Sequence, residues 1–334
     1  MYKIGLDIGY GNTKIVTEKG NRICFPSLAK PGEKIELDKM LSAAGDYVVT
    51  INGQTWFVGE MAAKEHRFAI RAFDDTQRFN NPAFQAMLAT SIAAVISGDE
   101  QNILLVTGLP LSSYAKSEKE FRDFLSNFTA MVEIGGVEKH IAVKQAHVFP
   151  QAAGIFLNPH CENFKKEIKP GELTTVVDIG YRTTDVATFK YTLNEDFEFV
   201  LEYSFTLDIG MVSVFRDLAN RIAEEIGAFD VSFESAERTF MTGSCRVDGK
   251  EKDYGDVNRL VAQKTVESIA DAYRQRGPGK DTYSHVIMAG GGSIALKSEL
   301  SKAFPGAMFM EDAQFANAIG FLTVAKKLDI VLFD

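Results

Sequence analysis

The residues that decide the fold are Leu6-Asp7-Ile8-Gly9-Tyr10-Gly11-Asn12-Thr13-Lys14, because the chain contains this pattern twice. The second copy is Val177-Asp178-Ile179-Gly180-Tyr181-Arg182-Thr183-Thr184-Asp185, near the middle of the chain. Each copy reads as an apolar strand, an Asp, a Gly-containing turn and a second β-rich run. This order predicts a β-hairpin with a tight turn in each half of the chain.

Such a turn suits an anion, because glycine leaves the backbone N–H groups accessible to a ligand. The Asp at the strand end repels a phosphate, but it can hold Mg²⁺, directly or through water, with phosphates on the other side of the metal. One copy alone would be an ordinary strand end and turn. Two copies in the same strand–turn–strand context predict two similar half-domains that grip one phosphate chain.

Length and composition indicate a soluble two-domain protein. The chain has 334 residues, 46% hydrophobic and 24% charged, which suits two domains of ordinary globular composition. A net charge of −9 argues against a broad basic face for nucleic acid. The three cysteines and five histidines show no disulfide or zinc spacing. We expect no signal peptide and no membrane span, and therefore a cytoplasmic protein.

Strand and helix signals alternate along both halves. Asn52-Gly53 predicts a hairpin inside a β-rich insertion at about residues 20–75. Pro82 begins a helix that stops at Gly98, and the capping box at 117–120 predicts the start of the next helix. The second half is expected to contain strands at 173–178, 197–205 and 285–289, a helix at 212–226, a largely helical segment at 228–282, and a last helix capped by Asp312.

Five segments together resemble the actin, sugar-kinase and heat-shock ATPase superfamily, and most closely the plasmid-segregation actins of the ParM type. The two Asp-Ile-Gly-Tyr hairpins are similar to its two phosphate loops. The segments 148–154 and 315–320 resemble its two connecting segments, and 286–293 its adenosine motif. Each match is weak alone, but all five occur in the family order across nearly the whole chain. The segment 108–114 adds a match to the ParM branch.

The resemblance implies an α/β protein with the actin-like (ribonuclease H-like) fold, in which two similar domains flank a nucleotide cleft. Domain I would span residues 1–157 with its insertion at about 20–75, and a C-terminal helix at about 313–334 would pack back on it. Domain II would span 158–312 with a helical insertion at about 228–282.

The resemblance also implies roles for individual residues. Asp7 and Asp178 would hold Mg²⁺ through water, with Asp185 a weaker candidate, and Gln151 would orient the attacking water, because glutamine is too weak a base to deprotonate it. The ParM branch often has Glu at this position, so Gln151 departs from the pattern of that branch. ATP, or alternatively GTP, would be bound by two phosphate-loop sets and one adenosine-motif set: Gly9, Gly11, Asn12 and Lys14; Gly180, Thr183 and Thr184; Gly290, Gly291, Gly292 and Ser293.

The leading hypothesis is therefore an ATPase that assembles with itself into helical filaments. It would polymerise with Mg-ATP and disassemble after hydrolysis. It would contact DNA only through an adaptor protein of a plasmid-segregation system. The alternatives are a small-molecule kinase of the same superfamily and a chromosomal or phage cytoskeletal actin homologue. The insertions are short and leave few residues for a sugar-binding site, which argues against the kinase. We expect no direct nucleic-acid contact, because the chain is acidic. We also expect no membrane anchor, because the segment 326–334 is short and contains acidic residues.

Overall fold

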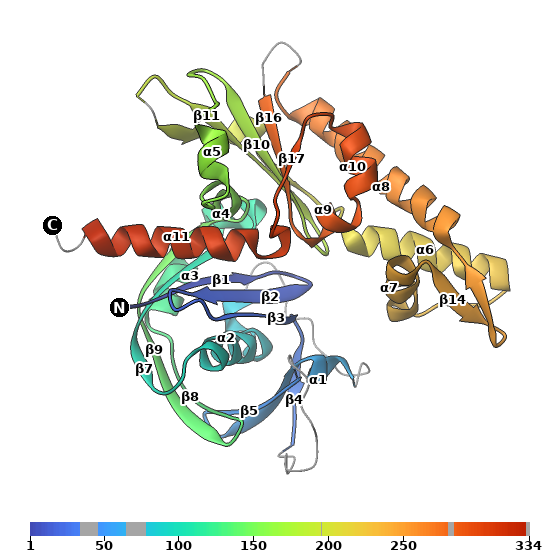
Figure 1. The fold of residues 1–334 in the computed structure, drawn as a ribbon. Coiled ribbons are helices and arrows are strands. Elements are labelled where there is room, and N and C mark those ends of the chain that lie inside the picture. Colours follow the sequence, from blue (N-terminus) through green and yellow to red (C-terminus); the bar gives the residue numbers. More distant parts are fainter. Residues whose placement is uncertain (34–45, 65–77, 195, 280–283, 332–334) are drawn as a thin grey trace. The chain divides into compact units, whose positions relative to one another are not determined.

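The computed structural model describes residues 1–33, 46–64, 78–194, 196–279 and 284–331 (Figure 1). Parts of the predicted insertion at 20–75, of the predicted insertion at 228–282 and of the predicted C-terminal helix therefore lie outside the described residues. The chain divides into two compact units, Met1–Glu167 with Gln314–Asp334, and Ile168–Ala313. The C-terminal helix belongs to the first unit, and the division falls between residues 167 and 168 where the sequence suggested 157 and 158.

The first unit is built on a nine-stranded sheet with the order β3-β2-β1-β7-β9-β8-β5-β6-β4 (Figure 1). Strands β1 and β2 form the first predicted hairpin, and β7 and β9 continue the sheet in parallel with β1. The strands of this sheet are β1 Tyr2–Ile8, β2 Asn12–Thr17, β3 Arg22–Pro26, β4 Ala29–Pro31, β5 Asp46–Ile51, β6 Gln54–Gly59, β7 Glu100–Leu109, β8 Thr129–Ile134 and β9 Val137–Pro150.

Strands β5 and β6 meet at the predicted Asn52-Gly53 turn, where both residues have positive φ (49° and 86°). A positive φ at both central residues is what a type I′ hairpin requires, and Asn-Gly adopts it readily. The hairpin is more than a surface decoration, because β5 pairs with β8 and extends the main sheet. Val49, Trp56 and Val58 place their side chains in the core.

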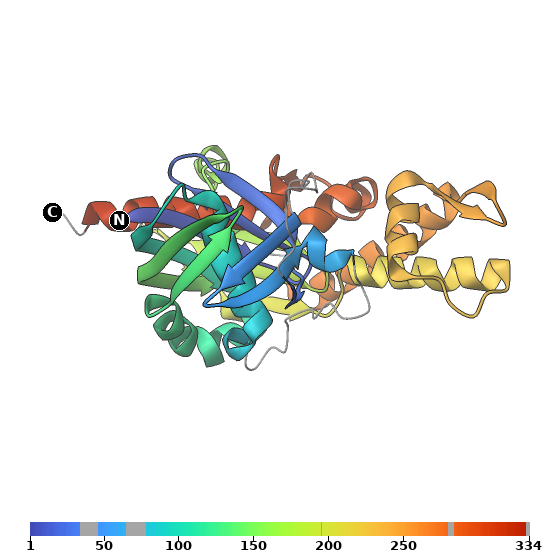
Figure 2. The same cartoon turned by 90° about the horizontal axis from the view of Figure 1, so that it is seen from below.

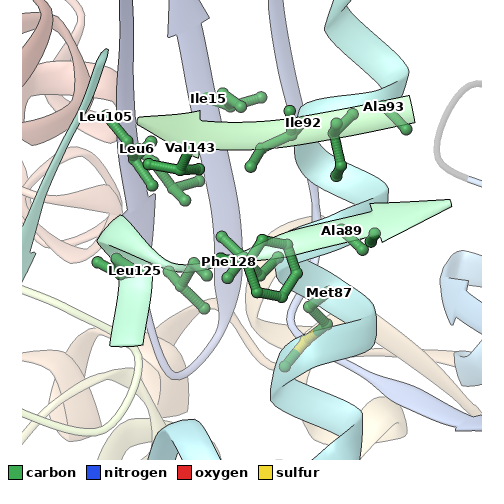
Figure 3. Packing of buried hydrophobic residues seen from close by; sticks show 14 of the residues in the cluster. Leu6, Ile15, Met87, Ala89, Ile92, Ala93, Leu105, Leu125, Phe128 and Val143 are labelled. Carbon is green, nitrogen blue, oxygen red and sulfur yellow. The ribbon is translucent and has the colours of Figure 1, made fainter. Parts of the chain in front are cut away.

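Helix α2 (Pro82–Val95) supplies the centre of that core. The Asn81 side chain accepts a hydrogen bond from Ala83 N and so caps the helix where the sequence places its start. The helix is apolar around most of its circumference, as expected for a buried helix. Figure 3 shows Ala89, Ile92 and Ala93 of this helix in one cluster with side chains from the sheet, Leu6, Ile15, Leu105 and Val143.

Helix α3 (Leu111–Ser126) begins six residues before Ser117, the first residue of the predicted capping box, so that prediction is wrong. The Pro110 carbonyl accepts hydrogen bonds from Ser113 N and Tyr114 N, both at 3.0 Å, and thereby starts the helix directly after β7. The Tyr114 hydroxyl also donates to the Val148 carbonyl of β9. The bonds to Pro110 and the contact of Tyr114 with β9 stabilise a first turn that local spacing did not reveal. The helix buries Phe121 and Leu125 in the core.

The remaining helices of the first unit are short, except for the last. They are α1 Glu60–Ala63, η3 Arg78–Asn80, α4 Ala153–Phe156, α5 Cys161–Lys165 and α11 Ala316–Val331. Helix α11 packs closely on β1, because a Cβ atom added at Gly5 would lie 2.1 Å from the Ala318 carbonyl oxygen. Only glycine permits this approach between strand and helix.

The second unit repeats the central sheet of the first. Its order is β12-β11-β10-β16-β17, with β13 paired to β11 (Figure 1). Two antiparallel pairings are followed by two parallel ones, as in β3-β2-β1-β7-β9. The strands are β10 Leu173–Ile179, β11 Thr184–Tyr191, β12 Phe197–Phe199, β13 Phe205–Leu207, β16 Ser284–Ala289 and β17 Met308–Phe309. The mixed α/β layout predicted for both halves is confirmed.

The strand predicted at 197–205 is interrupted. Residues Leu201–Tyr203 form the short helix η4, which separates β12 from β13. The Thr188 backbone N–H, which faces this break, donates to the Ser204 hydroxyl, and the Val200 N–H donates to the Thr188 carbonyl. A local bulge of this kind disrupts the ladder without leaving its polar groups unpaired.

The helices of the second unit are α6 Met211–Ile226, α7 Phe233–Thr242, α8 Gly255–Arg276, α9 Gly291–Ala295 and α10 Lys297–Ala303, and η5 Ala313–Phe315 follows across the division. Helix α6 ends at Gly227, in the left-handed conformation, as predicted. The segment 228–282 also contains a hairpin, β14 Ser244–Val247 and β15 Lys250–Asp253, that the sequence did not reveal. Figure 2 shows this hairpin beside α7 at one end of the unit.

Among the described helices, none combines the length and the apolar character that a bilayer crossing requires.

Candidate functional site

The two predicted turns have the same backbone geometry. In the first unit Gly9 N donates to the Asn12 carbonyl at 3.1 Å, and in the second unit Gly180 N donates to the Thr183 carbonyl at 2.9 Å. The strand pairing is also the same, since Asp7 lies opposite Lys14 and Asp178 lies opposite Asp185. Each unit therefore presents a carboxylate at the end of a strand, directly before a glycine turn.

In the first unit three predicted site residues come together. Lys14 Nζ lies 3.0 Å from Asp7 Oδ2, and Gln151 Nε2 donates to Asp7 Oδ1 at 3.2 Å. The side chains of Lys14 and Asp7 are only 14% and 7% exposed. Burial strengthens this pair relative to one in water, and each carboxylate oxygen has a donor. Asp7 is thus held rigidly between a cation and an amide.

Gln151 is positioned by a constrained piece of backbone. Its N–H donates to the Leu109 carbonyl at 2.7 Å, and the next residue, Ala152, has φ 69°. A non-glycine residue in this left-handed region costs free energy and persists only where the surroundings hold it. Here the Asn317 side chain of α11 accepts a hydrogen bond from Ala152 N.

The two segments predicted as connecting segments meet within the first unit. A Cβ atom added at Gly320 of α11 would lie 1.7 Å from the Gly154 carbonyl oxygen, so the two backbones touch. The Asn158 side chain donates to the Ala316 carbonyl beside this crossing. Helix α11 therefore fixes the segment that carries Gln151.

Cys24 on β3 lies opposite Lys14 in the sheet. Burial raises the pKa of its thiol, the Lys14 ammonium lowers it, and the carboxylates of Asp7 and Glu60 raise it further. A thiol with a raised pKa is a poor nucleophile at neutral pH. Cys24 therefore contributes packing and a weak acceptor for the Gln314 side chain, and we assign it no chemistry.

In the second unit the glycines of the 290–292 segment pack behind Asp178. Gly290 has φ 80°, and a Cβ atom there would lie 2.3 Å from the Ile179 carbonyl oxygen and 2.4 Å from Asp178 Oδ1. A Cβ atom at Gly292 would lie 2.4 Å from Ile179 Cγ2. At Gly291 such an atom would meet nothing within 4 Å. Two of these glycines thus serve the packing behind the turn, whereas Gly291 faces open space.

Two of the three predicted hydroxyl residues are buried and donate to backbone carbonyls, and the third is half-buried. The Thr184 hydroxyl is buried and donates to the Ile209 carbonyl at 2.7 Å, and the Ser293 hydroxyl is buried and donates to the Gly290 carbonyl at 2.8 Å. The Ser293 bond closes its own turn, whereas the Thr184 bond connects the second turn to the segment before α6. Thr183 is half-buried at the tip of the second turn. Asp185 is buried and accepts a hydrogen bond from the Thr206 hydroxyl.

The second turn rests on a support that was not predicted from the sequence. Met211 N and Val212 N, at the start of α6, donate to the carbonyls of Gly180 and Tyr181 at 3.2 and 2.7 Å. Gly210 permits this contact, since a Cβ atom there would lie 2.7 Å from the Tyr181 carbonyl oxygen. A signal existed, because residues 208–210 are a third Asp-Ile-Gly triplet.

A magnesium ion would suit these residues only in company with a phosphate. Among the described residues no group of three or more Asp, Glu, His or Cys side chains is close enough to cage a metal. Magnesium, however, usually keeps several waters and takes one or two carboxylates together with substrate phosphates. A single strand-end carboxylate beside a glycine turn in each unit, Asp7 and Asp178, fits that kind of coordination.

Two family models match successive parts of the chain. The N-terminal domain of actin-like proteins matches residues 5–154, and the C-terminal domain of MreB-like archaeal actin homologues matches residues 176–302. Curated proteins named archaeal actin homolog, from Thermoplasma acidophilum and Thermoplasma volcanium, are each 29% identical over 340 residues and cover 98% of this chain and 99% of their own length.

Solved structures agree with these matches. A ParM from a 15-stranded Clostridium botulinum filament superposes with a TM-score of 0.87 at 24% identity, covering 98% of this chain and 99% of its own. An archaeal actin homolog in complex with ADP superposes with a TM-score of 0.79 at 25% identity, covering 98% and 100%. The actin-like fold is thus matched over nearly the full chain, and the chain belongs to the actin-like protein family.

Proposed function

We propose that this actin homologue binds ATP with Mg²⁺, polymerises into filaments in that state, and disassembles after hydrolysis. The observation that carries the proposal is the duplicated turn, with the same hydrogen bond and the same strand register in both units. A nucleotide stabilises the conformation that it prefers by its differential affinity, and loss of the γ-phosphate reduces that affinity. The relatives support self-association, since one of the similar structures is a filament.

The roles of the individual residues follow from their positions. Asp7 and Asp178 would hold Mg²⁺ through water, and the tips of the two turns, Gly9 to Asn12 and Gly180 to Thr183, would take the phosphates. Lys14 and Gln151 already contact Asp7, so Lys14 would neutralise charge, and the Gln151 amide would orient a water. Gly291 would lie against the nucleoside, while Thr184 and Ser293 would hold the turns in shape.

The cellular role that we propose is segregation of DNA, with an adaptor protein between filament and DNA. The net charge of −9 disfavours direct contact with nucleic acid. The similarity to ParM supports this role, and the archaeal actin homologs support a cytoskeletal role in general. A cytoplasmic location remains a prediction from the sequence.

The test is sedimentation with light scattering of the purified protein in Mg-ATP, Mg-ADP and no nucleotide. We expect wild type to pellet with Mg-ATP, and Asp178→Ala to remain in the supernatant because the second turn loses its metal-binding carboxylate. Asp256→Ala is the matched control, since Asp256 is an exposed carboxylate on α8 and its loss should leave pelleting unchanged. Wild type that stays monomeric, and turns over ATP only when small hydroxyl compounds are added, would instead favour the kinase.

A further inference from the structure

The second turn carries a cation, Arg182, that has no counterpart at the same position of the first turn. Arg182 lies at the tip of this turn, at the position that Gly11 occupies in the first turn. Its guanidinium Nε lies 3.3 Å from Asp208 Oδ1, which belongs to the segment that leads into α6. The side chains of Arg182 and Asp208 are 44% and 78% exposed. Exposed pairs of this kind contribute little to stability, so their cost of separation is low.

Charge explains why the second turn needs this cation. In the first turn Lys14 lies opposite Asp7 and neutralises it. In the second turn the equivalent strand position is Asp185, so two carboxylates, Asp178 and Asp185, lie side by side on neighbouring strands. Arg182 is the only Lys or Arg between residues 178 and 185. An anion that approaches this turn meets both carboxylates, and Arg182 offsets one of their two charges.

The backbone beneath Arg182 is held firmly, so its side chain starts from a defined place. Gly210 packs against the Arg182 backbone, where an added Cβ atom would lie 2.6 Å from the carbonyl carbon. Helix α6 donates two hydrogen bonds to the turn, as described above. Tyr181 packs against Phe215 of α6 and Phe233 of α7, with ring centroids 6.2 and 6.5 Å away.

We propose that Arg182 binds the phosphate chain of the nucleotide and that Asp208 holds its guanidinium until the phosphate replaces it. A guanidinium group can bind either a phosphate or a carboxylate, because its planar set of donors forms paired hydrogen bonds with both anions. In this exchange the Arg182 guanidinium leaves the exposed Asp208 carboxylate and binds the phosphate chain, which carries more negative charge. This inference rests on the proposed nucleotide binding and adds a specific ligand residue to it.

The experiment measures the affinity of the full chain for Mg-ATP, Mg-ADP and adenosine by calorimetry. Arg182→Ala should weaken Mg-ATP binding about tenfold or more, the usual effect of losing a charge-assisted hydrogen bond, and leave adenosine binding unchanged. Arg182→Lys should give an intermediate affinity, because lysine keeps the charge but not the planar donors. Arg259→Ala is the matched control, since Arg259 forms an exposed pair with Asp256 elsewhere in the unit.

A double-mutant cycle tests the exchange itself. Asp208→Asn should strengthen Mg-ATP binding about two- to fivefold by releasing the guanidinium. In an Arg182→Ala background the same change should have a smaller effect. Equal effects in both backgrounds would overturn the exchange, because Asp208 would then act only by repelling phosphate. Thermal unfolding of each variant shows whether it remains folded.

The outcome for wild type separates this inference from the proposed function. If wild type binds Mg-ATP and Arg182→Ala binds it equally well, the inference falls and the proposed function stands. If wild type binds no Mg-ATP, both fall.

Discussion

The two glycine turns share one backbone but differ in how their charges are held. In the first unit Asp7 is buried and satisfied by Lys14 and Gln151. In the second unit Asp178 is half-buried, with Gly290 directly behind it, and the nearby cation Arg182 pairs with an exposed carboxylate. The same backbone turn therefore occurs with two different charge arrangements. The ion pair of the first turn is buried and held in place, whereas the ion pair beside the second turn is exposed and separates at lower cost.

The largest expected effect concerns the glycine behind the second turn. Gly290→Ala should destabilise the protein by about 2–4 kcal/mol, because its φ of 80° and the 2.3 Å approach to the Ile179 carbonyl oxygen leave no place for a Cβ atom. A fall in the thermal unfolding midpoint would show this.

Gly291→Ala is the control for that variant. A Cβ atom there meets nothing within 4 Å, so stability without ligand should change by less than about 0.5 kcal/mol. Its effect should appear only in nucleotide affinity. Equal unfolding midpoints for the two variants would contradict the packing role of Gly290.

The next effect compares the two cations directly. Lys14→Met should cost about 1–3 kcal/mol, because it leaves the buried Asp7 carboxylate without its ion-pair partner. Arg182→Met should cost less than about 1 kcal/mol, because its pair with Asp208 is exposed. Urea unfolding of both variants in the absence of nucleotide measures the difference. A larger loss at Arg182 than at Lys14 would reverse the assignment of the preorganised turn.

The smallest expected effect sharpens the role of Gln151. Gln151→Glu replaces a donor to Asp7 with a second carboxylate, so repulsion should raise the pKa of the new carboxyl in the folded state. A raised carboxyl pKa destabilises the folded state at high pH. We expect a cost of about 1 kcal/mol at pH 7, which diminishes as pH falls through the folded pKa and vanishes below the unfolded one.

Gln151→Met separates charge from the lost hydrogen bond. It removes the donor to Asp7 without adding charge, so its cost should not vary with pH in this way. Unfolding of both variants across pH 4–8, a range chosen to span the ordinary carboxyl titration, is the measurement. Parallel stability curves for the two would show that repulsion at Asp7 is absent.

Much of the local structure followed from the sequence, because short-range signals determined it. Asn52-Gly53 formed the predicted hairpin, Asn81 capped the helix that begins at Pro82, and Gly227 ended α6. The predictions failed where contacts distant in sequence decided. Helix α3 starts early because it contacts β9, and the strand at 197–205 breaks where Ser204 satisfies the Thr188 N–H.

The sequence by itself determined that the chain has two related halves, because the repeated Asp-Ile-Gly-Tyr turn is a local pattern whose glycine and strand preferences need no partner. It also identified Asp7, Lys14 and Gln151 as site candidates. Only the tertiary structure decided that these three touch, that Gly290 backs Asp178, and that Asp208 holds Arg182. The reason is physical: such pairings join residues on separate strands, helices and turns, and packing of the whole unit sets their distances.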